Sequence, residues 1–352
     1  MVKPIRRTNS DLAMASSRLS RFGAVALLLS GFLAATTTVA QAQTQTGNGY
    51  TAYRIGSATD VTRTTSTGAV LMGGGADVDA AFVWMIGKSG GGNFVVLRSS
   101  GTDGYNSYIN GLGTVTSVET LVVTSRTGAN DAYVADKVRN AEAVFIAGGD
   151  QASYWNNWKG TALSSALQSA IDRGIPIGGT SAGMAVLGEF VYTALNASVT
   201  ATAALRNPYV RDVTLGRDFL NVPNLDGIIT DTHFYARDRM GRPITFLARL
   251  VKDGWIGTAY GIAADEGTAA LIDGNGTATI VGSQYVYFFK TPGMPQTCVS
   301  GTRLTYRDVN VYRCAGSAGQ TFDLNTWTGS GGLSYRVSAV NGALSSSKGS
   351  VY

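Results

Sequence analysis

Histidine and cysteine are scarce in this sequence. Its 352 residues contain one histidine, His233, and two cysteines, Cys298 and Cys314. A structural zinc site takes four ligands, mostly cysteine and histidine, so this composition argues against one. There is no Cys-x-x-Cys pair, which argues against dithiol redox chemistry. The sequence thus predicts no metal and no organic cofactor, and any reaction that needs an imidazole base has to use His233.

Apolar runs long enough to span a membrane are also missing from the N-terminal region. The apolar segment 22–35 falls short of the roughly 20 residues that a spanning helix needs. It follows a basic stretch and precedes Ala40-Gln41-Ala42, which fits an A-x-A cleavage site. We therefore predict a signal peptide over residues 1–42, export to the periplasm or the cell exterior, and no stable membrane insertion. An uncleaved anchor is the alternative.

An excess of charge is missing from the rest of the chain. The whole sequence has 28 Lys and Arg against 23 Asp and Glu, and without residues 1–42 the balance is 23 against 22. No basic stripe remains that would bind nucleic acid or an anionic membrane surface. About 310 residues are left, and we predict a single domain over residues 50–352. The sequence does not fix the oligomeric state, and a homodimer is left open.

Both cysteines lie in the C-terminal part of the chain. Disulfides form and persist in exported proteins, so we predict a Cys298–Cys314 bond. The alternative is a pair of buried free thiols, because free cysteine is among the most buried residue types.

Apolar strand patterns alternate with helical patterns in the first half of the chain. Strands are expected over 69–72, 93–97, 120–123 and 143–146 and from Pro176 onward, and helices over 77–87, 132–140 and 162–173. Strands that are apolar throughout and separated by helices indicate a mostly parallel sheet covered on both faces, and hence an α/β fold. Polar loops at the carboxyl ends of such strands are where these sheets build binding sites.

The second half of the chain has a different pattern. Segment 191–224 is expected to be irregular, and a strand over 227–230 and a helix over 237–251 follow it. Four further strand patterns have hairpin spacing, which predicts antiparallel strands at the C-terminal end. These strands are expected over 269–272, 278–281, 285–289 and 303–312.

Gly179-Thr180-Ser181-Ala182-Gly183 fits the pattern G-x-S-x-G at a strand-to-helix turn. Such a turn is sharp and lifts the serine hydroxyl clear of the sheet, which predicts Ser181 as a nucleophile. The N–H of Ala182 is then expected to stabilise a tetrahedral oxyanion. Gly149 or Asp150, after the preceding strand, is expected to supply a second N–H.

A serine nucleophile needs a base, most often a histidine oriented by an acid. His233 follows a strand pattern, as Ser181 does, which favours it as the base over a purely structural histidine. Asp265 and Glu266 are adjacent candidates for the acid, and at most one is expected to face His233 because neighbouring side chains on extended backbone diverge. Asp231 is a third candidate.

Four motifs in this order resemble the cyanophycinase family over roughly residues 68–325. They are Gly148-Gly149-Asp150-Gln151, Gly178 to Gly183, Asp231-x-His233-Phe234 with Arg237, Arg239 and Arg242, and Asp265-Glu266-x-Thr268-Ala269. The resemblance implies a three-layer α/β/α fold like that of the class I glutamine amidotransferases. It also implies a serine peptidase with Ser181 as nucleophile, His233 as base and Glu266 as orienting acid. Substrate-lining residues implied in the same way are Gln151, Asp231, Arg237, Arg239 and Arg242.

The chain departs from the family pattern at two positions. Thr232 stands where the family has glutamine, and Met184 replaces a small residue after the nucleophile turn. The resemblance implies cyanophycin, a β-aspartyl-arginine polymer, or a related aspartyl peptide as the substrate, and the arginine cluster is expected to bind a substrate carboxylate because guanidinium groups recognise carboxylates. A secreted esterase or amidase that uses the same serine is the alternative, as is an inactive binding protein. An ordinary α/β-hydrolase is disfavoured because its acid precedes the histidine.

Overall fold

The computed structural model describes residues 42–352. The signal peptide predicted over residues 1–42 therefore lies outside the described range, except for Ala42. In the described part of the chain, every helix is too short or too polar to cross a bilayer.

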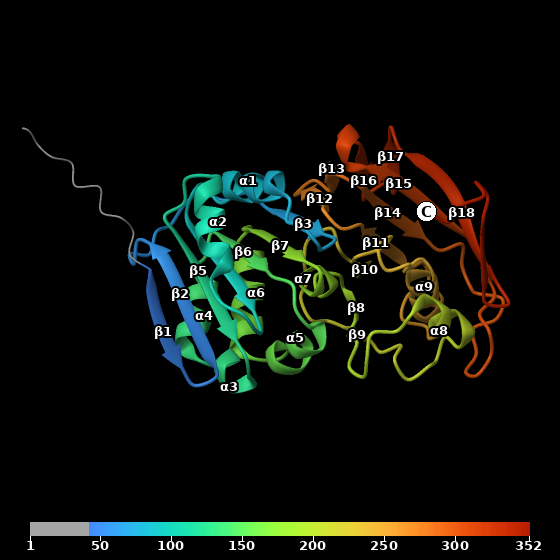
Figure 1. The fold of residues 1–352 in the computed structure, drawn as a ribbon, viewed down its shortest axis with the longest axis horizontal. Helices are drawn as coiled ribbons and strands as arrows, with labels where there is room; N and C mark the ends of the chain where they lie inside the picture. The colour runs from blue at the N-terminus through green and yellow to red at the C-terminus, as the bar shows by residue number, and fades with distance from the viewer. Residues whose placement is uncertain (1–41) are drawn as a thin grey trace, which may run out of the picture. The chain divides into compact units, whose positions relative to one another are not determined.

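Two β-sheets and nine α-helices make up the described chain (Figure 1). The first sheet has 11 strands, which are, in spatial order, β1 (Gln43–Gly47), β2 (Tyr50–Gly56), β5 (Ser117–Val123), β4 (Asn93–Arg98), β6 (Ala143–Ile146), β7 (Pro176–Thr180), β3 (Gly68–Met72), β12 (Thr268–Asp273), β13 (Thr277–Gly282), β16 (Thr321–Asp323) and β17 (Thr328–Ser330). The second sheet has eight, which are β19 (Ala343–Ser346), β18 (Leu333–Val340), β15 (Tyr306–Ala315), β14 (Tyr285–Lys290), β11 (Tyr260–Ala264), β10 (Ile228–Asp231), β8 (Phe190–Tyr192) and β9 (Leu215–Arg217). The helices are α1 (Asp79–Lys88), α2 (Gly104–Leu112), α3 (Arg126–Ala129), α4 (Ala132–Arg139), α5 (Gln151–Trp158), α6 (Ala162–Asp172), α7 (Ala182–Ala185), α8 (Ala201–Arg206) and α9 (Gly241–Lys252), with a 3-10 turn over Gly316–Ala318.

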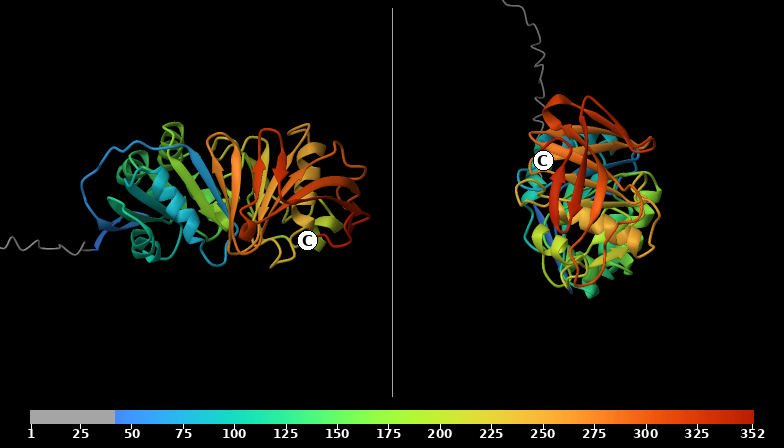
Figure 2. Two further views of the ribbon diagram at one scale, coloured as in Figure 1. Left: turned by 90° about the horizontal axis from the view of Figure 1, so that it is seen from above. Right: turned by 90° about the vertical axis from the view of Figure 1, so that its right-hand side faces the viewer.

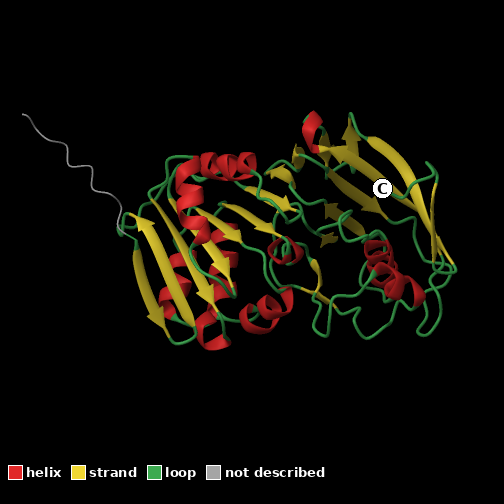
Figure 3. Ribbon diagram, in the orientation of Figure 1, coloured by secondary structure: helices red, strands yellow, loops and turns green. Residues whose placement is uncertain are grey.

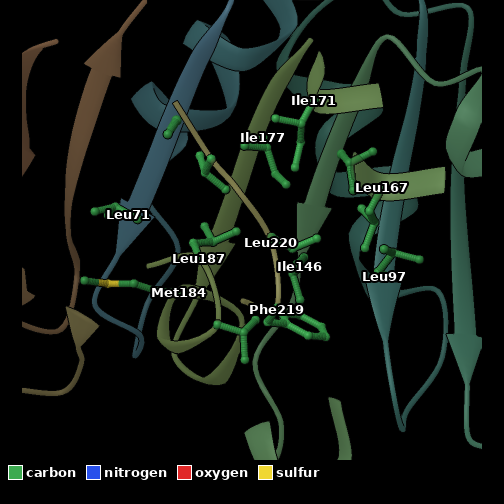
Figure 4. Packing of buried hydrophobic residues seen from close by; sticks show 14 of the residues in the cluster. Leu71, Leu97, Ile146, Leu167, Ile171, Ile177, Met184, Leu187, Phe219 and Leu220 are labelled. Carbon is green, nitrogen blue, oxygen red and sulfur yellow. The ribbon is translucent and has the colours of Figure 1, made fainter. Parts of the chain in front are cut away.

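The centre of the first sheet is parallel and covered by helices on both faces (Figure 3). Side chains alternate between the two faces of a strand. In β4, Phe94 and Val96 pack with apolar residues of α1 and α2, whereas Val95 and Leu97 pack with those of α4 and α6. Figure 4 shows part of the second of these cores, with Leu97 of β4 and Leu167 of α6 among the labelled side chains. These apolar strands therefore form a middle layer between two layers of helices, as their uninterrupted hydrophobic runs predict.

The flanks of the first sheet are antiparallel. β2 pairs antiparallel with β5 at one side, and β12 pairs antiparallel with β3 at the other. The predicted hairpin of 269–272 with 278–281 is present as β12 and β13. The first sheet is therefore mixed.

A second sheet was not predicted, and it corrects the expectation of one mostly parallel sheet with an antiparallel extension. The strand expected over 227–230 is β10, and it pairs in parallel with β11 and β8 of the second sheet. Helix α9 packs on one face of this sheet. On the other face, the ring of Phe288 in β14 stacks on that of Phe322 in β16 at 3.9 Å between centroids, so the two sheets pack against each other. The views of Figure 2 show the strands of both sheets. The coarser prediction of an α/β fold is confirmed.

The predicted disulfide is wrong, because both cysteines are free and buried. Cys314 lies on β15, where alternation turns it to the face opposite Val309 and Val311. It joins the core of the first sheet, whereas Cys298 joins the core beneath α9. The thiols therefore face different cores, and the alternative of two buried thiols holds.

Candidate active site

Ser181 occupies a strained turn between β7 and α7. Its φ and ψ angles are 53° and −119°, which is a sparsely populated region for a residue with a side chain. Its N–H donates to the carbonyl oxygen of Met72 at 3.1 Å, which fixes the turn to the neighbouring strand β3. The turn ends a buried strand and begins a helix, as the G-x-S-x-G pattern predicts.

Close packing explains the glycines on either side of this serine. A Cβ atom at Gly179 would lie 2.5 Å from the carbonyl carbon of Gly183, and one at Gly183 would lie 1.9 Å from the oxygen of Ile146. Neither position can accept a side chain unless the backbone moves. The two glycines therefore let the beginning of α7 pack closely against the backbone of β6 and β7.

Ser181, His233 and Glu266 form a continuous chain of hydrogen bonds. The Oγ of Ser181 lies 2.7 Å from Nε2 of His233, and Nδ1 of His233 lies 2.6 Å from Oε1 of Glu266. The three residues come from the ends of different strands: Ser181 follows β7, His233 follows β10, and Glu266 connects β11 to β12. The site thus lies where the two sheets meet.

The glycine loop Gly73-Gly74-Gly75, which follows β3, supports the hydrogen bonds between Ser181, His233 and Glu266. The sequence patterns did not predict this role. The carbonyl oxygen of Gly73 accepts the N–H of His233 at 2.7 Å, and that of Gly74 accepts the N–H of Gly267 at 2.9 Å. A Cβ atom at Gly74 would lie 2.4 Å from Cε1 of His233, and one at Gly75 would lie 2.8 Å from Cβ of Glu266. Three consecutive glycines directly after a buried strand were the available signal for this loop.

The imidazole of His233 has a lowered pKa. Burial is the largest cause, since it disfavours the charged ring, and the nearby cations Arg237 and Arg239 lower it further. The hydrogen bond to Glu266 acts in the opposite direction and favours the charged ring. The net effect keeps the imidazole neutral, which is the form that accepts a proton.

The other two candidate acids point elsewhere. Asp265 is 2% exposed, and its carboxylate accepts the N–H groups of Tyr235 at 2.8 Å and Tyr285 at 3.3 Å. Asp231 lies 3.0 Å from Nη2 of Arg242. Of the three carboxylates considered from the sequence, Glu266 is the one that reaches the imidazole.

A cavity of about 360 Å³ opens beside Ser181 and His233. Gln151, Arg237 and Arg239 line it, together with the predicted oxyanion residues Gly149, Asp150 and Ala182. The loop 194–198, which follows β8, also lines it. The cavity therefore combines the Ser–His pair, backbone donors and two guanidinium groups.

Asp231 and Arg242 lie beneath the cavity and are not among the residues that line it. Arg242 is 2% exposed and stacks on the ring of Tyr192 at 4.6 Å. Asp231 also lies 3.7 Å from Arg239. This buried ion pair adjoins the cavity through Arg239 and through Ser198, whose hydroxyl oxygen lies 3.2 Å from Nη1 of Arg242.

The two departures from the family pattern have different positions. Thr232 lies on the cavity, and its carbonyl oxygen accepts Nη1 of Arg239 at 2.7 Å. Met184 is fully buried, and its carbonyl oxygen accepts the hydroxyl of Thr230. Threonine in place of glutamine at position 232 therefore affects the contacts of Arg239. Methionine in place of a small residue at position 184 affects the packing of the core.

The loop after β6 is held by Tyr154. Its hydroxyl lies 2.9 Å from the carbonyl oxygen of Ala147 and 3.1 Å from that of Gly148. In a trans peptide the N–H points opposite to the C=O, so the N–H of Gly149 is turned away from Tyr154. A Cβ atom on Gly148 would lie 3.4 Å from Cβ of Ser181, which places this loop directly beside the serine.

Within residues 42–352, no group of three or more His, Cys, Asp or Glu side chains is arranged to hold a metal ion.

A known peptidase family matches part of the chain. Residues 104–206 match peptidase family S51. This segment contains Gly149, Gln151 and Ser181, whereas His233 and Glu266 lie beyond it.

Curated relatives are cyanophycinases. That of Geminocystis herdmanii is 28% identical over 191 residues, which cover 52% of this chain and 64% of the relative. That of Synechococcus elongatus is 27% identical over 169 residues, which cover 48% of each chain. The chain thus matches about half to two thirds of the length of these relatives. The predicted resemblance to the cyanophycinases is confirmed.

Two solved structures are more distant matches. A peptidase from an acI-B1 Actinobacterium has a TM-score of 0.49 at 18% identity, covering 67% of this chain and 98% of that one. A putative peptidase E protein from Listeria monocytogenes EGD-e has a TM-score of 0.41 at 16% identity, covering 61% and 98%.

Proposed function

We propose that this chain, which resembles the S51 peptidases, is an exported serine exopeptidase that hydrolyses cyanophycin or related aspartyl peptides. Ser181 is the nucleophile, His233 the general base and Glu266 the acid that orients the imidazole. The observation that carries the proposal is the unbroken hydrogen-bond chain from Ser181 through His233 to Glu266 beside a cavity lined by arginines.

The hydrogen-bond chain supports one tautomer of the imidazole. Ionised Glu266 can only accept, so Nδ1 of His233 carries the proton and donates it to Oε1. The lone pair of Nε2 then accepts the hydroxyl proton of Ser181. A carboxylate that holds the ring in this state also stabilises the imidazolium that forms during the reaction.

Acylation starts with attack of the Ser181 oxygen on the carbonyl carbon of the scissile peptide bond, while Nε2 of His233 takes the hydroxyl proton. The tetrahedral intermediate collapses when the C–N bond breaks and His233 gives the same proton to the leaving amine. The product is an acyl ester on Ser181. A water molecule, deprotonated by His233, then attacks this ester. When the bond between the acyl carbon and the Ser181 oxygen breaks, His233 returns the proton to that oxygen, which frees the serine and the carboxylate product.

Backbone N–H groups support the oxyanion of both intermediates. Ala182 is the first residue of α7, so its N–H lacks an intrahelical acceptor. The orientation of the Gly148–Gly149 peptide favours Gly149 over Asp150 as the second donor, because Tyr154 holds the carbonyl of Gly148 on the opposite side. Removal of one such donor typically costs about 10²- to 10³-fold in kcat.

Charge on the cavity supports an acidic substrate. Arg237 and Arg239 line the cavity. Guanidinium groups bind carboxylates through paired hydrogen bonds, so these side chains can hold an acidic group of the substrate. Gln151 adds an amide to the same wall. We assign these three residues to substrate binding, and we assign Asp231 and Arg242 to holding Arg239 and the cavity floor.

The finer description of the fold belongs to the same proposal. The resemblance implies the class I glutamine amidotransferase type, and the helix-covered parallel strands β5-β4-β6-β7-β3 support it.

Export is supported by the N-terminal sequence. N-terminal sequencing of protein recovered from the periplasm or medium should begin at Gln43, and an intact Met1 there would contradict cleavage.

The activity test is incubation of residues 43–352 with insoluble cyanophycin and measurement of soluble dipeptide. We expect release by the wild-type protein and a loss of at least about 10³-fold in Ser181→Ala. His233→Ala and Glu266→Gln should also lose activity while they keep the wild-type circular dichroism spectrum. Cleavage of simple esters without peptide release would favour an esterase or amidase, and no turnover of any substrate would favour a binding protein. Undiminished release by Ser181→Ala would overturn the proposed mechanism.

A further inference from the structure

The loop between β10 and α9, residues 233–240, carries His233 and both cavity arginines. Two of its residues have left-handed backbone conformations, with φ 47° at His233 and 45° at Asp238. Such conformations persist only where surrounding contacts hold them. The contacts that hold this loop therefore determine where the imidazole and the guanidinium groups lie.

The first part of the loop is held by neighbouring backbone. The N–H of His233 donates to Gly73, that of Phe234 to the carbonyl oxygen of Ala264 at 3.3 Å, and that of Tyr235 to the buried carboxylate of Asp265. The N–H groups of Arg237, Asp238 and Arg239 bond within the loop itself. Side chains hold the second part of the loop: Nη1 of Arg239 donates to the carbonyl oxygen of Thr232 at 2.7 Å, and a further anchor comes from outside the loop.

Tyr352 supplies that anchor from the far end of the sequence. Its hydroxyl accepts the N–H of Met240 at 2.8 Å and donates to Oδ1 of Asp238 at 2.9 Å. Its ring packs edge-on against Phe234 and Tyr235, with centroids 5.6 Å and 5.2 Å apart. One side chain therefore contacts both the beginning and the end of the loop.

The position of Tyr352 is itself fixed by the second sheet. Its main-chain oxygen accepts the hydroxyl of Ser350 at 3.0 Å and the ammonium group of Lys348. The hydroxyl of Tyr335, on β18, donates to the carbonyl oxygen of Val351 at 2.9 Å. The tail after β19 is thus hydrogen-bonded to the second sheet, and this bond helps to fix the position of the Tyr352 side chain against the loop.

We propose that Tyr352 is a positioning residue that holds the arginine-bearing part of the loop 233–240 in place for substrate binding. This inference rests on the proposed function. Tyr352 does not line the cavity, so it acts through Arg237 and Arg239. Because His233 has its own backbone anchors, loss of the Tyr352 hydroxyl should weaken substrate binding and leave the Ser181–His233 pair intact.

The test is the Tyr352→Phe variant, which keeps the ring and removes the hydroxyl. Tyr306→Phe is the matched control, because its hydroxyl donates to the carbonyl oxygen of Gly293 at 2.7 Å, away from the loop. Amide hydrogen exchange at Met240, followed by NMR, should accelerate about five- to tenfold in Tyr352→Phe and stay unchanged in Tyr306→Phe. For cyanophycin-derived aspartyl peptides, KM should rise about fivefold with kcat within about twofold.

Labelling of Ser181 by a small sulfonyl fluoride should proceed at the wild-type rate in Tyr352→Phe, because this reagent does not need the arginines. Wild-type exchange at Met240, an unchanged KM, or a parallel loss of labelling would each overturn the proposal. If the wild-type protein cleaves no peptide, the proposed function fails. In that case the exchange comparison still decides whether Tyr352 holds the loop.

Discussion

His233 has a lowered pKa because it is buried next to two arginines. A general base must be neutral in the free enzyme, so the acid limb of kcat/KM follows the pKa of this imidazole. A lowered pKa moves that limb below the ordinary histidine value of 6.5. The same arginines that are proposed to bind the substrate thus add to the lowering of the His233 pKa that burial causes.

Replacement of Arg237 by glutamine should raise the pKa of His233. The substitution removes a cation that disfavours the imidazolium, so protonation becomes easier and the acid limb moves to higher pH. Because the chain has a single histidine, one imidazole resonance in an NMR titration reports this pKa without substrate. Arg307→Gln is the control, since Arg307 is exposed and lies outside the cavity. An equal or lower pKa in Arg237→Gln would contradict the assigned role of the cation.

At the level of elements, the glycine loop after β3 fixes the geometry of the hydrogen-bond chain. We expect Gly74→Ala to abolish most activity, because its Cβ atom would lie 2.4 Å from the imidazole and its φ is +96°. Displacement of the ring by even about 1 Å costs on the order of 10²-fold in rate. Peptide release and thermal unfolding, measured together, check this expectation.

Gly254→Ala is the matched control for that variant. Gly254 also has a positive φ of +73°, but nothing lies within 4 Å of the added Cβ atom. Both variants should therefore lose about 1–2 kcal/mol of stability from backbone strain, and the contact with the imidazole should add to this loss in Gly74→Ala. Only Gly74→Ala should lose activity, and full activity in that variant would show that the loop does not position His233.

Local patterns predicted the elements that carry Ser181 and His233, because each depends on a short run of neighbouring residues. The strand expected over 143–146 is β6, and the serine turn follows β7 as G-x-S-x-G predicts. Helix α2 was missed, since Gly104–Leu112 contains glycine, asparagine and serine, which have weak helix propensity. The contacts of the glycine loop and of Tyr352 depend on strands that pair across long sequence separations, and no local pattern encodes them.

On the scale of the whole molecule, the site depends on how the two sheets pack. Ser181 ends a strand of the first sheet, His233 ends a strand of the second, and Glu266 lies where the chain passes from β11 to β12. β10 reads from sequence as a further parallel strand, and its pairing with β11 in another sheet was not foreseeable from its apolar residues. The distance from Ser181 to His233 is therefore a property of the interface between the sheets.

The same two-sheet arrangement predicts the behaviour of the cysteines. Cys298 and Cys314 lie in different cores, so the purified protein without reductant should give two thiols per chain after denaturation. In the native state both should react slowly with an aromatic disulfide reagent, because burial raises the pKa of Cys298 to about 11 and that of Cys314 to about 12. Cys298→Ser should give one thiol under the same conditions. Two reactive thiols that appear only after treatment with reductant would instead reveal a disulfide, and a disulfide would require a different packing of β15 from the one described.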